Sequence, residues 1–466
     1  MRALLLASAA LFAACASPDA SADRATVHDD VLARTNATAN APESPLADAD
    51  LQALLREPLT AATAVQVTLL NNHRVRATYQ RLGIAKADLV QAGLLRNPTL
   101  DISIRRLEGG GLDSQYGLPL RVLDLFWQPL RENLAAHEFT AAKLRITEEL
   151  VHLVFAVRRA HAEAQAAEAL AAVHRRMLAT AEAAHELMVE LHAAGNATDR
   201  QLAEARVGES RARLDLATAE QDTKEAREPL QTLLGLWGQA TEWTLADTFG
   251  APLPTLDLEH VESRAIATSL ALQAHRAGLD ALAQQVGLDD WRGWFPDLAF
   301  GPNVISNPNE GTGYGARAAL DLPLFDDGST RVARDQAQLA AGLHDHVQLA
   351  VEIRSAARLL RDRVTMLTER ERFLREVHLP ARKAAVRTTT QSYNAMQIGA
   401  FDVLEAQQLL LADERDQANT ALAAWRAVLD LQQLLAGSPP SRALDRLGDG
   451  RDAAIATRAT IQGAPR

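Results

Sequence analysis

Two stretches of this sequence, Gly195 to Gly235 and Gly399 to Gly437, are copies of one another, so the chain contains a duplicated long helical unit. With an offset of 201, the matches are Glu204-Ala205 on Glu405-Ala406, Ala226 on Ala427, Leu230-Gln231 on Leu431-Gln432 and Leu233-Leu234 on Leu434-Leu435. A chance match would not stay in register over that distance. This self-similarity constrains the fold strongly, because each copy is expected to form the same supersecondary structure.

The duplication extends upstream, since Asn97-Pro98-Thr99-Leu100 recurs as Phe295-Pro296-Asp297-Leu298 at an offset of 198. Each copy contains a helical run, a Pro, a strand pair, a very long helix, a Gly-containing turn and a helix that runs back. The first copy is predicted over 49–250, with strands at about 99–126 and a helical hairpin at about 129–236. The second is predicted over 251–437, with strands at about 298–325 and a hairpin at about 329–436.

The N-terminus has the layout of a bacterial signal peptide, because Met1-Arg2 and an apolar run precede two small residues and the only cysteine, Cys15. The stretch Leu11 to Cys15 resembles a lipobox, which predicts removal of residues 1–14 and lipidation of Cys15. The following Ala16 is not acidic, so the lipobox resemblance implies the outer membrane. A plain secretory signal cut near Ala14, with Cys15 as a free thiol, is the alternative.

Both ends are predicted to be flexible. Residues 15–48 are rich in Ala, Asp, Ser, Thr and Pro and show no apolar period, which is typical of a linker. Ser438-Pro439-Pro440 breaks the last helix, and the polar residues 438–466 are expected to form a flexible tail.

Charge and composition exclude several classes of site. The net charge of -11 and the absence of a Lys/Arg cluster interleaved with aromatics argue against a nucleic-acid partner. The 13 histidines are scattered, and His344 and His346, two residues apart on a predicted helix, point to different faces. Neither a metal site nor a cofactor is therefore expected, and a single cysteine allows no intramolecular disulfide.

The strand segments alternate between apolar and polar residues. From Thr99 to Arg105 the apolar side chains occupy even positions, and in the second copy Tyr314 to Leu324 alternates in the same way. This second strand is about eleven residues long, the length that a tilted membrane strand requires. A soluble two-stranded hairpin packed on the helices is the alternative.

The helices are unusually long. Pro129 suits a helix N1 position, and a helix from there to His192 would span on the order of 95 Å at 1.5 Å per residue. Its counterpart, from about Thr330 to Ile398, contains Pro380, where we expect a kink. Such helices must bury an apolar stripe, although periodicity alone does not reveal what they enclose.

No apolar run of 18 or more residues is present, so a β-barrel is the only way for this chain to span a membrane. The four candidate strands cannot close a barrel, because the smallest membrane barrels have about eight strands. The sequence therefore predicts a homo-oligomer in which each copy contributes strands to a shared wall.

The residues resemble the TolC-like outer-membrane efflux channels over roughly 60–437. The resemblance rests on four motifs: Leu89 to Leu100, Gly195 to Leu202, Leu320 to Gly328 and Gly399 to Gln407. It implies a mainly α fold with a β part, in which duplicated helical hairpins of three copies form an α-barrel and four strands per copy form a shared transmembrane β-barrel. It also implies a passive, non-enzymatic efflux duct, whose periplasmic tips dock on a membrane-fusion adaptor connected to an inner-membrane pump.

Within that resemblance, the two Gly-containing turns would be the tunnel tips that contact the adaptor. Gly195 and Gly399 are expected to supply the positive φ of a reversing helix, although a plain C-cap explains them equally well. Asp199 and Asp402 are candidate N-caps of the returning helices and also candidate carboxylates of a narrow aperture. The second turn is predicted to be three residues shorter than the first.

A periplasmic adaptor and a structural coiled-coil lipoprotein are the alternative functions. An adaptor should have one helical hairpin flanked by compact β modules, and a structural coiled coil should lack the strand pairs. No nucleophile elbow, P-loop or dinucleotide-binding Gly-rich turn supports an enzyme. The cargo stays open between drugs, metal ions and proteins.

Overall fold

The computed structural model describes residues 19–38, 48–106, 111–238, 242–246, 249–250, 252–294, 297–307 and 311–440. Cys15 and residues 441–466 lie outside these ranges. The chain divides into two compact units. One contains Met1–Val27, Thr78–Thr147 and Leu270–Val351, and the other contains His28–Ala77, Glu148–Ser269 and Glu352–Arg466.

The longest element is α6 (Asp124–Ala193), whose 70 residues correspond to about 105 Å of helix. It begins at Asp124, so the prediction that Pro129 occupies the N1 position is wrong. The first turn is tightened, because Leu125 N–H donates to Val122 O and Phe126 N–H donates to Leu123 O, both three residues back. Pro129 follows within the next turn, where it removes one helical hydrogen bond close to the start.

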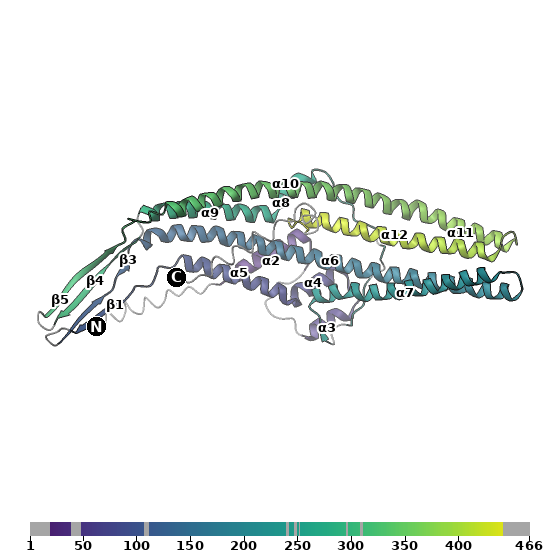
Figure 1. Cartoon of the computed structure of the whole chain (residues 1–466), viewed down its shortest axis with the longest axis horizontal. Coiled ribbons are helices and arrows are strands. Elements are labelled where there is room, and N and C mark those ends of the chain that lie inside the picture. Colours follow the sequence, from purple (N-terminus) through teal and green to yellow (C-terminus); the bar gives the residue numbers. More distant parts are fainter. Residues whose placement is uncertain are drawn as a thin grey trace. The chain divides into compact units, whose positions relative to one another are not determined.

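The returning helices show the duplication in structure. Helix α7 (Asp199–Leu234) and helix α12 (Ala400–Leu435) each contain 36 residues, and both ends differ by the sequence offset of 201. Helix α7 runs back along the end of α6, where Glu168 binds Arg227 at 2.7 Å and Arg175 binds Glu220 at 3.3 Å. Helices α11 (Leu379–Asn394) and α12 form the second hairpin (Figure 1).

The second long helix is interrupted near Pro380. Helix α10 (Ser329–Phe373) continues into a π-helical turn, η3 (Leu374–His378), and then into α11. Leu379 N–H donates to Leu374 O, five residues back, so the wider turn precedes Pro380. A π turn is a recognised cause of helix bending and accommodates a residue that lacks an N–H donor. The first copy has no such interruption in α6.

The strands form one antiparallel sheet (Figure 1). Its strands are β1 (Asp101–Arg106), β2 (Leu112–Gly117), β3 (Leu120–Arg121), β4 (Leu298–Asn307) and β5 (Gly311–Leu320). The order is β1-β2-β4-β5, and β3 continues along β4 beyond β2. Pro119 separates β2 from β3, and β5 ends at Leu320 rather than at Leu324, because Pro323 cannot donate to a ladder.

The shorter helices complete the two units. They are α2 (Ser21–Thr35), α3 (Asp48–Arg56), α4 (Ala61–Asn71), α5 (His73–Ala92), α8 (Val261–Thr268) and α9 (Leu270–Trp294). Helix α2 contradicts the prediction that residues 15–48 are a flexible linker throughout. Val27 and Val31, four residues apart, are buried, and Arg158 Nη2 donates to Thr35 O at 2.6 Å. Two valines were too short a stripe to stand out in an Ala- and Asp-rich background.

The core of the second unit lies between the helices that the duplication predicts. Leu150, Val154 and Val157 of α6 are buried, as are Leu431 and Leu434 of α12. Alanines fill many of the other buried positions on α6 and α12, which lets the helix backbones approach closely. Full burial of a Leu or Val side chain stabilises a fold by about 1.5–3 kcal/mol. These buried residues of α6 and α12 therefore stabilise the packing of the helices.

Candidate functional site

The sheet has one apolar face. Register places Ile102, Tyr116, Val304 and Tyr314 opposite one another as a single row across β1, β2, β4 and β5. Ile102, Tyr116 and Tyr314 are exposed, and so are Ile104 and Phe300 on the same face. An apolar face of this size without a cover in the described chain requires an apolar environment or a partner surface.

The other face of the sheet is polar and carries paired charges. Arg105 binds Asp113 at 3.5 Å, Arg121 binds Asp297 at 2.8 Å and Arg317 binds Asp101 at 3.5 Å. Between them, Gln115 Nε2 donates to Asn303 Oδ1 at 3.1 Å. All of these residues have odd numbers, and the register places them on the face opposite the apolar row.

A charged pair spans the polar face. Asp101 lies on β1 and Arg317 on β5, which are the two outer strands, and their side chains meet at 3.5 Å. Arg317 crosses positions that carry little side chain, since Gly117 and Gly315 share the register row of Asp101. The sheet therefore has one polar face, which this ion pair bridges, and one apolar face.

Both edges of the sheet are open. Within the described residues, the outer edges of β1 and β5 pair with no further strand, and every residue of β5 is exposed. Unpaired strand edges bind other strands readily. The edges of β1 and β5 are therefore available for pairing with further strands.

The first hairpin tip is the connection 194–198 between α6 and α7. Gly195 has φ +77°, which confirms the expected positive φ. The N-cap is Thr198, whose Oγ1 accepts from Gln201 N–H at 3.3 Å, while the Gln201 side chain accepts from Thr198 N–H at 2.9 Å. The prediction that Asp199 is the N-cap is therefore wrong. Asp199 is the first helical residue, and its carboxylate lies 2.7 Å from His192 Nε2.

The second tip, 395–399, corrects three predictions. Gly399 is an extended N-cap with φ -81°, and the left-handed residue is Met396, with φ +58° and a side chain that is 94% exposed. Asp402 is not the predicted N-cap but the third residue of α12, and its Oδ2 accepts from Gly399 N–H at 2.9 Å. Both connections contain five residues, so the second turn is not shorter. The offset of 201 places Met396 on Gly195 and Gly399 on Thr198.

Known proteins share this combination of an antiparallel sheet and long helical hairpins. No family model matches the chain. The cobalt-zinc-cadmium resistance protein CzcC of Cupriavidus metallidurans is 24% identical over 370 residues, which cover 76% of this chain and 84% of CzcC. The solved CmeC outer membrane channel of Campylobacter jejuni matches with a TM-score of 0.67 at 14% identity, over 89% of this chain and 98% of CmeC. The open state of the Neisseria gonorrhoeae MtrE outer membrane channel matches with a TM-score of 0.62 at 19% identity, over 81% and 89%.

This chain has the fold of the TolC-like outer-membrane channels. The similarity confirms the predicted resemblance and the predicted fold class, long helical hairpins with a strand part. The similar structures are outer membrane channels, and the similarity covers most of their length. The domain boundaries stay predictions, and Cys15 lies outside the described residues.

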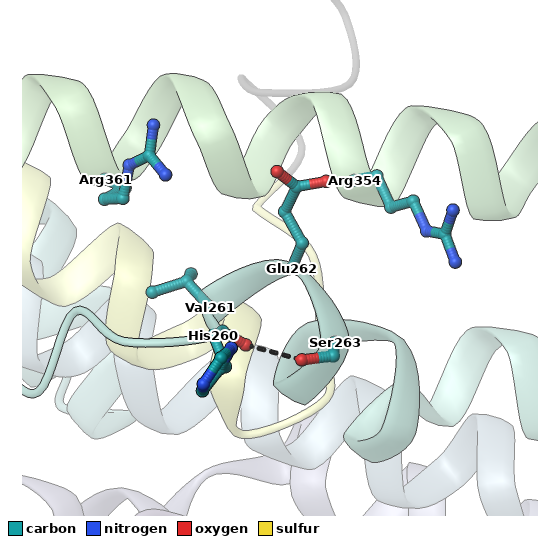
Figure 2. Close-up of a pocket in the computed structure, with 6 residues that line it drawn as sticks. All are labelled: His260, Val261, Glu262, Ser263, Arg354 and Arg361. Atoms are coloured by element: carbon teal, nitrogen blue, oxygen red, sulfur yellow. Dashed lines mark hydrogen bonds between the residues drawn. The ribbon is translucent and has the colours of Figure 1, made fainter.

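Outside the sheet and tips, the TolC-like chain has a small open pocket beside α8. It is lined by His260, Val261, Glu262, Ser263, Arg354 and Arg361 (Figure 2). Ser263 Oγ donates to the backbone oxygen of His260 at 2.9 Å, so the imidazole does not activate this hydroxyl. Arg358 neutralises Glu262 at 2.8 Å. The pocket therefore contains no nucleophile and base in productive contact.

The described residues contain no cluster of three or more His, Cys, Asp or Glu that could hold a metal ion. His344 does not meet His346; instead, His346 lies against His275 of α9, with ring centroids 5.6 Å apart. Among the described helices, none combines enough length with enough apolar residues to cross a membrane.

Proposed function

We propose that this chain is the outer-membrane channel of a tripartite efflux system, a passive exit duct for substrates that an inner-membrane pump delivers through a periplasmic adaptor. The observation that carries the proposal is the two-faced sheet. One face is apolar, the other carries paired charges, and both edges are open among the described residues. A lipid-facing outside and a polar inside are the arrangement of a transmembrane β-barrel.

The channel is a homotrimer in this proposal. A wall of four strands per copy reaches the size of known membrane barrels only when several copies join, and three copies give twelve strands. The helices offer a further surface for the same contact. Leu343, Val347 and Val351 are exposed and lie four residues apart along α10, so they form one apolar stripe. A second copy is the partner that would cover it.

The hairpin tips dock on the adaptor, and the adaptor connects the channel to its pump. The proposed contacts include the turns at Gly195 and Gly399, to which the structure adds the exposed Met396. Asp199 and Asp402 stay candidate aperture carboxylates, because both lie in the first turn of a returning helix. Matching by residue type pairs Gly195 with Gly399 and therefore does not identify Met396.

The proposed location is the outer membrane, with acylated Cys15 as a second attachment and the long helices in the periplasm. The protein catalyses no reaction and needs no cofactor in this proposal. The cargo is a drug, a metal ion or a protein. The name of CzcC states cobalt, zinc and cadmium resistance for that relative, so these cations are the first cargo to test.

Fractionation and channel recording test the proposal together. We expect the native protein in outer-membrane fractions, where a bifunctional cross-linker should trap it as an oligomer. After extraction in detergent and reconstitution in a planar bilayer, it should open a water-filled path for ions. A monomer in the soluble periplasm that conducts no ions would contradict the proposal.

A further inference from the structure

We infer that the polar face of the sheet is a charge-balanced pore lining, in which Asp101 and Arg317 set the discrimination between cations and anions. The inference rests on the proposed channel function. It concerns the barrel wall rather than the hairpin tips, and it identifies two residues by their position in the sheet.

The paired charges lie at three levels along the strands. Arg105 and Asp113 are close to the β1–β2 hairpin, and Arg121 and Asp297 are at the end next to the long helices. Asp101 and Arg317 lie between them, about four residues or 13 Å from either level. Each Arg has an Asp partner on the same face, so no pair leaves a net charge.

The middle pair is the most accessible to ions in the pore. The side chains of Asp101 and Arg317 are 42% and 51% exposed. In the other two pairs one member is shielded, because Asp297 is 25% exposed and Asp113 is 18% exposed. A charge that water reaches on the inner wall interacts with passing ions, whereas a shielded carboxylate interacts mainly with its own arginine.

Register gives the middle pair its exposure. Gly117 and Gly315 occupy the same row as Asp101, so no side chains from these positions cover the two charged groups. Asn303, the remaining member of the row, is buried and turned toward Gln115. In a closed wall of three copies, the row would present three carboxylates and three guanidinium groups at one height. Their balance predicts weak discrimination by the sign of the ion's charge.

Neutralising one partner should reveal the charge of the other. D101N would leave three uncompensated arginines in the trimer and should shift the permeability ratio toward chloride by about twofold or more at low salt, where screening is weak. R317Q should shift the ratio toward potassium by a similar factor. The double variant, D101N with R317Q, should return close to the wild-type value because the row is neutral again.

The measurement is the reversal potential across a planar bilayer with a potassium chloride gradient, using the full-length trimer. Ser103→Ala, on the same face and without charge, is the matched control and should leave the potential unchanged. If D101N does not assemble, R317Q and the double variant provide the same comparison. Conducting channels whose reversal potential is unchanged in both single variants, or shifted in one direction by both, would overturn this inference. Failure of the wild-type protein to conduct would instead contradict the proposed channel function.

Discussion

At the scale of single residues, a partly buried polar network joins α6 to α12. Arg159 Nη1 donates to Asp430 Oδ1 at 2.7 Å and to Gln433 Oε1 at 2.8 Å. The Gln433 amide is thereby oriented, and its Nε2 donates to His152 Nδ1 at 3.0 Å. His152 must accept this hydrogen bond, so the fold requires the neutral imidazole. Burial, followed by the nearby Arg159 and Arg74 charges, lowers the pKa of His152 below its ordinary 6.5.

This network predicts a loss of stability in mild acid. A lowered pKa in the folded protein contributes stability that is complete above pH 6.5 and is lost as pH falls from there through the folded pKa. Each unit of pKa difference corresponds to about 1.4 kcal/mol. His152→Gln should therefore give a thermal midpoint that changes less between pH 7 and pH 5 than that of the native protein, as thermal unfolding followed by circular dichroism can show. An equal slope in both proteins would refute the assignment.

At the scale of elements, Gly301 is required where β4 passes the break between β2 and β3. A Cβ at this position would overlap the Leu118 carbonyl and the Pro119 Cα. Leu118 N–H donates to Pro302 O at 3.1 Å, so the break is held tightly against β4. The glycine therefore permits the close approach that lets one edge of β4 pair with two short strands in succession.

Gly301→Ala should weaken the sheet and the assembly that depends on it. The overlap involves backbone atoms that cannot turn away, so we expect a cost of roughly 1–3 kcal/mol, typical of overpacking. The readout is the temperature at which the oligomer dissociates on a detergent gel. Gly313→Ala in β5 is the matched control, because it meets no atom within 4 Å, and its dissociation temperature should stay near the native value. Equal temperatures in both variants would argue against this role of Gly301.

Much of the element layout was predictable, because the repeat fixes both copies at once. The returning helices α7 and α12 begin and end at an offset of 201, and the strand alternation predicted the two faces of the sheet. The tips were harder to predict. Aligning Gly195 with Gly399 matched residue type, whereas the register matches Gly195 with Met396, which adopts a backbone conformation that favours glycine. The alignment set by the flanking helices α7 and α12 therefore identifies the equivalent tip residues better than residue type does.

Contacts between distant segments could not be predicted from the sequence. Periodicity identifies the faces of a strand but does not give the pairing partner. The pair of Asp101 with Arg317 joins residues more than two hundred positions apart and became visible only in the structure. His192, which meets Asp199 across the first tip, was missed because a lone histidine in a helix gives no distinguishing signal.

At the scale of the whole molecule, closure of the proposed channel depends on the two open edges of the sheet. A single chain leaves β1 and β5 without outer partners among its described residues and exposes the apolar stripe of α10. Joining β5 of one copy to β1 of the next satisfies both edges, and repeating the contact three times closes a ring. A closed ring has a fixed number of copies, whereas an open arrangement of the same contact would continue indefinitely.

Cysteine cross-linking between the two edges tests closure most directly. One cysteine is placed on β1 and one on β5 in the same chain, scanned over neighbouring positions until the facing pair is found, with Cys15 left in place for acylation. Mild oxidation in outer membranes should produce covalent dimers and trimers and no larger species, and each single-cysteine variant should give no ladder. Chains that stay monomeric at every pair of positions, or a ladder that continues past three copies, would contradict the trimeric channel.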